Sequence, residues 1–410
     1  NETQFNIAKE SLANTYQSEQ KKYVESKIKD LKNCADNKQA STAWQIINEI
    51  SGRKKSNRAR YKAKDNDDRL NKWRTHFQNL QGNTILTIDI PIQQIHQRLN
   101  IKLGDFTMDE LKSALSKLKS KKAPGLDNIP PEVWKYCNFV NILLVFCYNV
   151  YNGNSFDKWT EGCILPFPKK GDLGVTDNYR GITLTAIAAK IYNSMLLNRI
   201  QPTLEKILRK NQNGFCKNRS TTGQTLTVRR IIEGVKDQNI PAVLLFVDFS
   251  KAFDSIHRPK MQKILLAYGI PEEIVHAIMM MYRNTKAKVR SPDGDTTFFD
   301  IITGVLQGDS LAPFIFILCL DYALRTSIDP LNNLGLTLHK KKSSRYPSIH
   351  LTDADYADDL AILADSISGA TQLLHSLEQS AKNIGLYVNT KKTEFIAYNC
   401  NGNISNISGN

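Results

Sequence analysis

Two acidic segments far apart in the sequence carry the clearest chemistry of the chain, residues 246–249 (FVDF) and 356–359 (YADD). Apolar strand-forming residues precede Asp248 and follow Asp358 and Asp359. A carboxylate within such a strand costs several kcal/mol to desolvate unless a cation or another partner compensates it. Three carboxylates on adjoining strands could hold two Mg²⁺ ions, an arrangement suited to phosphoryl or nucleotidyl transfer. The alternative is that the aspartates are unrelated, solvated strand ends.

The residues around these segments predict a sheet that brings the aspartates together. Residues 242–249 predict a buried strand, and residues 349–364 predict a hairpin with Ala357 and Asp358 near its tip. An almost wholly apolar helix over residues 307–325 should lie buried under this sheet. Further helices are predicted at 259–268 and 271–284, and a second hairpin at 286–299. Two strands, crossover helices and a hairpin are typical of a split βαβ arrangement.

The region upstream is predicted to be mainly helical. Thr107 and Glu110 form a capping box for a helix over residues 107–119. Two prolines open a second helix that continues through Trp134, and residues 185–209 predict a long amphipathic helix. This amphipathic helix is expected to turn Ile187, Ile191, Met195 and Leu196 inward.

Composition limits the class of protein. The chain has 410 residues, which suffice for two or three subdomains, and no apolar run reaches the roughly 18 residues that span a bilayer. We therefore expect no membrane partner. The net charge of +15 indicates an anionic partner, with nucleic acid the leading candidate. Seven scattered cysteines without a Cys-x-x-Cys motif indicate reduced thiols in an intracellular protein and argue against zinc.

Both ends of the chain are polar. Residues 53–64 hold seven basic residues and no acidic one, which predicts either a solvated linker or a flexible phosphate-binding arm. Before them, Trp44, Ile46, Ile47 and Ile50 form one apolar stripe. Residues 399–410 are rich in Asn, Ser and Gly, and are predicted to be disordered.

A series of segments in a fixed order resembles the reverse transcriptases of non-LTR retrotransposons. Any one of them is a weak signal, but their common order over roughly residues 105–398 argues against coincidence. The segments are 122–127 (KAPGLD), 166–172 (PFPKKGD), 178–182 (NYRGI), 212–215 (QNGF), 247–254 (VDFSKAFD), 304–310 (GVLQGDS), 356–359 (YADD) and 389–393 (NTKKT).

The resemblance implies an α+β fold with the fingers and palm of a right-hand polymerase, in which the palm is a split βαβ unit. It implies a basic, helical N-terminal extension at 1–104, fingers at 105–240 and a palm at 241–398, with the reverse transcriptase domain at about 150–400. The family's primer-gripping hairpin, thumb and upstream endonuclease are expected to be missing from this chain, which resembles a piece of a longer polyprotein.

The same resemblance implies an RNA-directed DNA polymerase that uses two Mg²⁺ ions, an RNA template, a DNA primer or target and deoxynucleoside triphosphates. It would act in the nucleus after a cytoplasmic RNA-bound stage. Asp248 and Asp358 would bridge the metals, and the carbonyl of Phe249 would complete one shell. Asp359 would be an outer ligand or a charge that tunes Asp358. Lys392 would protonate pyrophosphate, with Lys391 as the alternative, unless it is simply a solvated lysine.

Other family positions would bind nucleotide and template. Phe253 would lie beneath the incoming sugar and exclude a 2′-hydroxyl, or else be a plain core residue. Asp254 and Asp355 are expected to be structural, a helix cap and a strand-edge charge. The triphosphate would be bound by Lys169, Lys170 and Arg180, unless the lysines simply form a surface turn. The nascent base pair would be contacted by Gln307 and Gly308. The template would be faced by Gln212, Phe215, Lys217 and Arg219, unless these residues form an ordinary basic loop.

Two other functions remain open. A noncatalytic nucleic-acid-binding remnant would keep the basic groove without a productive primer grip. A group II intron maturase shares the palm, although the segment at 178–181 and the upstream basic helix favour the retrotransposon type.

Overall fold

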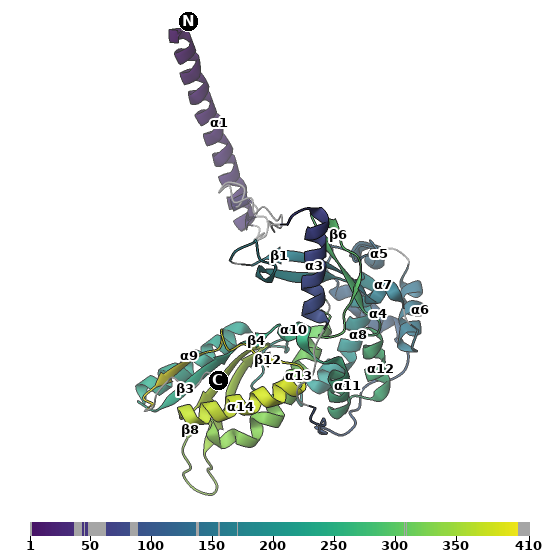
Figure 1. Ribbon diagram of the computed structural model, residues 1–410, viewed down its shortest axis with the longest axis vertical. Coiled ribbons are helices and arrows are strands. Elements are labelled where there is room, and N and C mark those ends of the chain that lie inside the picture. The colour runs from purple at the N-terminus through teal and green to yellow at the C-terminus, as the bar shows by residue number, and fades with distance from the viewer. Residues whose placement is uncertain are drawn as a thin grey trace. The chain divides into compact units, whose positions relative to one another are not determined.

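The computed structural model describes residues 2–36, 43–44, 46–47, 63–82, 89–136, 139–154, 156–169, 171–306, 308 and 310–400 (Figure 1). Its contacts divide the chain into two units, Asn1–Arg58 and Ala59–Asn410. The first unit contains the helix α1, Glu2–Asp36. Ile50 of the predicted apolar stripe and most of the basic segment, residues 53–62, lie outside the described residues. The sheets and the candidate site described below belong to the second unit.

A four-stranded antiparallel sheet carries both acidic segments. Its order is β10-β11-β3-β13, and β3 pairs with β11 from Leu360 opposite Val247 to Ala364 opposite Val243. Asp248 and Asp359 therefore lie at the same end of two adjoining strands, which confirms the predicted pairing. The strands are β3 (Ala242–Val247), β10 (Asp353–Tyr356), β11 (Asp359–Ala364) and β13 (Glu394–Tyr398).

Two strand predictions need correction. The strand predicted over 242–249 ends at Val247, and β4 (Phe249–Ser250) leaves the sheet to pair with β12 (Tyr387–Val388). The hairpin predicted over 349–364 begins at residue 353, because β9 (Ile349–Leu351) pairs with β8 (Leu336–His339) instead. Local sequence favours a strand at both places, but the partner strand is chosen by tertiary packing.

Helices cover both faces of this sheet (Figure 1). Val243 and Leu245 belong to the main core with α13 and α14, whereas Leu244 packs in a separate cluster with α9. This alternation follows from the period of two along a strand. The apolar helix predicted over 307–325 is buried as expected but begins later. The helices are α9 (Thr221–Asp237), α13 (Ala312–Ser327) and α14 (Ile367–Asn383).

A second, five-stranded sheet holds the segments at 166–172 and 178–182. β1 pairs with β2 as an antiparallel hairpin and with β5 in parallel. The antiparallel pairing of β5 with β6 confirms the hairpin predicted at 286–299. Trp73 and Phe77 of α3 are buried against this sheet. Its strands are β1 (Glu161–Pro168), β2 (Tyr179–Leu184), β5 (Lys286–Ser291), β6 (Gly294–Asp295) and β7 (Phe299–Asp300), and α3 is Asn66–Gln81.

Most of the remaining helices contribute side chains to the main core. The capping box of Thr107 and Glu110 is present at α4, as predicted. The helix predicted at 185–209 ends at Leu204 and is buried around most of its surface rather than amphipathic, because other helices enclose it. These elements are α4 (Met108–Lys117), α5 (Pro131–Tyr136), α6 (Val140–Tyr151), α7 (Asp157–Thr160), η1 (Thr176–Asn178), α8 (Ile187–Leu204), α10 (Ala252–Ser255), α11 (Arg258–Ala267), α12 (Glu272–Met280) and η2 (Asp329–Leu334).

None of the helices in the described part of the chain combines the length and apolar character that a membrane span requires. Six cysteines within the same residues are free thiols, and four of them are buried. They are Cys34, Cys147, Cys163, Cys216, Cys319 and Cys400.

Candidate active site

One cavity of about 550 Å³ gathers most of the predicted catalytic and nucleotide-binding residues. Its walls come from β4 and α10, which follow β3, from the turn at Asp358, from the five-stranded sheet and from α3, so segments from distant parts of the chain meet there. The sequence-predicted residues that line it are Lys169, Arg180, Asp248, Phe249, Phe253, Asp358 and Lys392.

Asp248 lies where the chain passes from β3 to β4, and the segment at 389–393 fixes its position. The Asn389 amide donates a hydrogen bond to Oδ2 of Asp248 at 3.1 Å, and the Asn389 backbone N–H donates to its carbonyl at 2.8 Å. The backbone N–H of Asp248 donates to the Thr393 hydroxyl at 3.4 Å. Nζ of Lys392 lies 3.5 Å from the same Oδ2, and this side chain is 70% exposed. The predicted lysine therefore lies beside the predicted metal ligand.

Asp358 and Asp359 lie at the turn between β10 and β11. Asp358 faces the cavity together with Asp248, whereas Asp359 borders a neighbouring groove on the sheet that Asp248 also reaches. Burial raises the pKa of Asp359, and the negative charges of Asp358 and Asp248 raise this pKa further. The three carboxylates are thus close enough to repel one another.

Carboxylate oxygens are the ligands that Mg²⁺ prefers, so the chemistry of Asp248, Asp358 and Asp359 fits that ion. Among the described residues, however, no three His, Cys, Asp or Glu side chains are grouped closely enough to form a complete metal site. The positive charge of Lys392 partly compensates the Asp248 carboxylate.

Two cationic side chains from the five-stranded sheet face these carboxylates across the cavity. Arg180 is exposed on β2, and Lys169 follows β1 and donates from Nζ to the carbonyl of Asp177 at 3.3 Å. Lys170 lies outside the described residues.

Sequence reasoning missed His76, which also lines this cavity from α3. Its side chain is only 9% exposed, and Nδ1 lies 3.4 Å from Oδ1 of Asp177. Burial lowers the pKa of His76, and the Lys251 and Lys169 charges also lower this pKa, although Asp177 opposes them. No local sequence pattern indicates that His76 lines the cavity, because its position depends on how α3 packs against β2.

Phe253 has features of both readings that the sequence left open. It lines the cavity, yet its ring stacks on Phe316 with centroids 4.3 Å apart and planes inclined by 20°. Gly308 adopts φ +110°, and a Cβ there would overlap the carbonyl oxygen of Thr183 on the cavity wall. Only glycine fits this close approach. Gln307 lies outside the described residues.

The predicted template residues divide into two groups. Phe215 is 51% exposed, and Lys217 and Arg219 are exposed as well, so a template role for these three stays a prediction. Gln212 is only 2% exposed, and its side-chain amide bonds to the backbone of Gly214 and Ala357. The prediction that the Gln212 side chain faces the template is therefore corrected, because its polar atoms are used inside the protein.

Comparison with known proteins adds independent information. The model of the family "Reverse transcriptase (RNA-dependent DNA polymerase)" matches residues 167–402. The chain is 25% identical to the "Retrovirus-related Pol polyprotein from type-1 retrotransposable element R2" of Popillia japonica, over 72% of this chain and 40% of that protein. It is 26% identical to the "Probable RNA-directed DNA polymerase from transposon BS" of Drosophila melanogaster, over 78% of this chain and 35% of that protein.

A third relative is the "RNA-directed DNA polymerase from mobile element jockey" of Drosophila melanogaster, which is 25% identical over 73% of this chain and 32% of its own length. The chain thus spans well under half of each of these relatives. The matched family model covers more than half of the chain and includes both acidic segments. The chain therefore belongs to the reverse transcriptase family, in the group found in non-LTR retrotransposons.

Proposed function

We propose that this chain is the RNA-directed DNA polymerase region of a non-LTR retrotransposon protein. In this proposal the four-stranded sheet belongs to the palm, β1 and β2 of the five-stranded sheet belong to the fingers, and the substrates are an RNA template, a DNA primer and deoxynucleoside triphosphates. The observation that carries it is the cavity that joins Asp248 and Asp358 to Lys169 and Arg180. A site for a triphosphate and its metal ions needs this combination of carboxylates and cations.

Asp248 and Asp358, with the backbone carbonyl of Phe249, are the groups that would hold two Mg²⁺ ions. When bound, such ions lower the pKa of the primer 3′-hydroxyl and stabilise the leaving pyrophosphate. Asp359, whose pKa is raised, contributes negative charge next to this pair.

The other cavity residues orient the nucleotide. Lys169 and Arg180 place fixed positive charge where the triphosphate accumulates negative charge. Lys392 is exposed enough to reach the departing pyrophosphate and donate a proton to it. The Phe253 ring, held by its stack on Phe316, forms a floor that leaves no room for a 2′-hydroxyl.

The test is primer extension on an RNA template with Mg²⁺. Asp248→Ala and Asp358→Ala should each abolish incorporation but leave RNA binding nearly unchanged, because contacts with phosphates supply most of the affinity. Asp237→Ala is the matched control, since this exposed aspartate ends α9 away from the cavity. Wild-type extension by either cavity variant would remove that residue from the site. RNA binding without any extension would favour the noncatalytic alternative.

A further inference from the structure

We propose that Gln212 is a positioning residue of the active site, whose side-chain amide holds the turn that carries Asp358, and that a buried ion pair of Arg209 anchors Gln212 there. This inference rests on the proposed polymerase function and extends it to residues outside the cavity. Neither residue lines the cavity that contains Asp248 and Asp358.

The turn needs such support because of its backbone conformation. Ala357, which immediately precedes Asp358, has φ +56°, in the left-handed region that residues with a Cβ rarely adopt. The Gln212 amide bonds to both polar backbone groups of Ala357. Its Oε1 accepts from the Ala357 N–H at 2.9 Å, and its Nε2 donates to the Ala357 carbonyl at 3.3 Å. One side chain therefore fixes both polar groups of the strained residue.

The segment around Gln212 also contacts the hairpin through its backbone. The Asn213 N–H donates to the carbonyl of Asp355 at 2.9 Å, and the Asp355 N–H donates to the carbonyl of Asn211 at 3.2 Å. A Cβ added to Gly214 would overlap the backbone nitrogen of Ala357. Residues 211–214 thus lie along the edge of β10 like an additional short parallel strand, with Gln212 opposite Asp355 and Gly214 against Ala357 of the turn.

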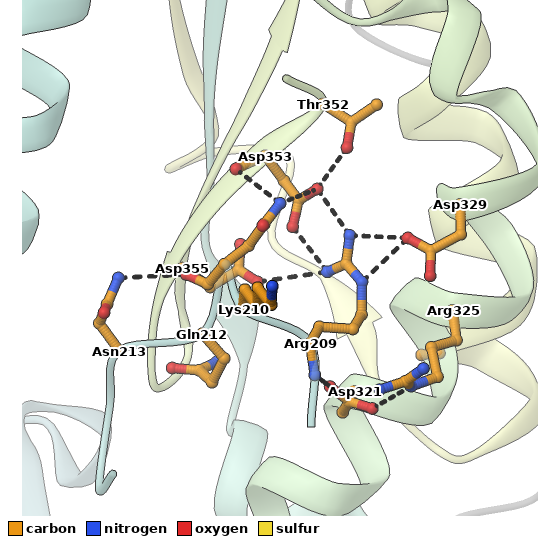
Figure 2. Close-up of polar contacts among 12 residues, drawn as sticks. Arg209, Lys210, Gln212, Asn213, Asp321, Arg325, Asp329, Thr352, Asp353 and Asp355 are labelled. Atoms are coloured by element: carbon orange, nitrogen blue, oxygen red, sulfur yellow. Dashed lines mark hydrogen bonds and ion pairs between the residues drawn. The ribbon is translucent and has the colours of Figure 1, made fainter. Parts of the chain in front are cut away.

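Arg209 anchors this segment to the same hairpin (Figure 2). Its Nη1 and Nη2 donate to the two oxygens of Asp353 at 2.6 and 2.7 Å, a bidentate pair in which Asp353 is fully buried. Its Nε donates to Asp329 at 3.0 Å, and its backbone N–H donates to Asp321 of α13 at 2.8 Å. The anchor therefore joins the segment before Gln212 to β10, η2 and α13.

Asp355, expected to be a strand-edge charge, is instead completely buried beside this ion pair. Its Oδ2 lies 3.5 Å from Nη1 of Arg209. Burial raises the pKa of Asp355 well above its usual range, and the Asp353 carboxylate raises it further. Asp353 thus forms the direct ion pair with Arg209, and the raised pKa of Asp355 favours its neutral form in the same buried cluster.

Gln212 also begins the loop whose exposed residues were predicted to face the template. The Arg219 guanidinium closes this loop by donating to the carbonyls of Lys210 and Gln212. The loop with Phe215 and the turn with Asp358 therefore share Gln212 as a common fixed point.

Gln212→Met tests this role, because methionine has a similar length but forms none of the three amide hydrogen bonds. We expect kcat for nucleotide incorporation to fall about 10- to 100-fold, the effect of losing buried hydrogen bonds. The KM for deoxynucleotide and the RNA affinity should change by less than about threefold, since Gln212 touches neither ligand. Hydrogen exchange at the Ala357 amide should accelerate by a factor similar to the loss in kcat.

Gln224→Met is the matched control. Gln224 is also buried, and its amide oxygen accepts from Asn213 at 2.5 Å, but it does not bond to the turn. This variant should keep the wild-type kcat and the slow exchange at Ala357. The more conservative Gln212→Glu keeps both acceptor bonds and should fall between wild type and Gln212→Met.

The outcomes separate this inference from the proposed function. If the wild type extends no primer, the polymerase proposal fails, while hydrogen exchange at Ala357 still tests the contact with Gln212. If Gln212→Met retains kcat and slow exchange, the positioning role is wrong. If both Gln212 variants lose kcat only in proportion to a loss of thermal stability, Gln212 is merely structural and the inference is also wrong.

Discussion

Asp353 and Asp355 allow one substitution to be compared at two neighbouring positions of β10. Both carboxyl groups are fully buried, and both lie within 3.5 Å of the Arg209 guanidinium. Asparagine at either position keeps the shape of the side chain and removes its ability to ionise. We predict different effects on stability, because Asp353 forms the bidentate ion pair with Arg209, whereas burial and the Asp353 charge raise the pKa of Asp355.

Asp353→Asn should destabilise the protein strongly. Asp353 accepts hydrogen bonds from Arg209, Asn211 and Thr352, so its charge is the centre of the cluster. Removing one partner of a buried ion pair costs about 3–5 kcal/mol, because the other charge stays buried without compensation. For a unit the size of residues 59–410, this corresponds to a fall in Tm of roughly 4–7 °C.

Asp355→Asn should be neutral or stabilising. Because the folded pKa of Asp355 is raised above the unfolded value, its stabilising contribution is complete below the unfolded pKa and is lost as the pH rises through the folded pKa. Asparagine resembles the protonated acid and does not ionise in either state. The variant should therefore match the wild type near pH 4 and gain stability relative to it as the pH rises.

Thermal unfolding of the wild type and both variants between pH 4 and pH 8 checks this assignment. The expected order at neutral pH is Asp355→Asn at or above the wild type, with Asp353→Asn far below. Equal losses in the two variants would refute the charge assignment. A larger loss for Asp355→Asn would reverse it.

Three further predictions concern other parts of the molecule. Phe253→Val should raise the ratio of ribonucleotide to deoxynucleotide incorporation efficiency at least about tenfold, because it opens space below C2′ of the sugar. Steady-state kinetics measures this ratio, and an unchanged ratio would contradict the role of Phe253 in excluding the 2′-hydroxyl. Neutralising the basic residues at 53, 54, 55 and 58 should flatten the slope of log RNA affinity against log salt by roughly 0.7–0.9 per lost phosphate contact; a linker predicts no change in a salt titration. Burial opposes ionisation of Glu110, but hydrogen bonds from Arg199 and other donors lower its pKa to about 2. Its stabilising contribution is therefore present above the unfolded pKa of 4.5 and is lost as the pH falls towards 2. Arg199→Met should move the midpoint of acid unfolding to higher pH, and an unchanged midpoint would count against this ion pair.

The elements that local chemistry defines were predictable from the sequence. The capping box at Thr107, the buried strand before Asp248 and the apolar helix before Arg325 each follow from side-chain type and spacing over a few residues. The adjacency of Asp248 and Asp358 was also predictable, because a carboxylate beside an apolar strand is costly to desolvate without a cation to compensate it; both residues are partly buried in the structure.

The features that the sequence did not predict correctly depend on contacts between distant segments. Gln212 lies in a polar, glycine-containing segment that resembles a surface loop, but β10 lies against it and buries it. Asp353 and Asp355 are two residues apart on one strand, so the sequence indicates that their side chains share a face of the sheet. It does not indicate that Arg209 lies against that face. His76 enters the cavity only because α3 packs on the five-stranded sheet.

The bonds that orient Asp248 also bear on when the site forms during synthesis. Asn389 and Thr393, which hold its side chain and backbone, follow it by 141 and 145 residues. Chains emerge from the ribosome N-terminus first, so β3 and the cavity-facing cations are synthesised well before these partners. A nascent chain that stops short of residue 389 has every predicted metal ligand but lacks the groups that orient the first of them. The groups that orient Asp248 in the proposed active site are therefore completed only after residues 389–393 have been synthesised.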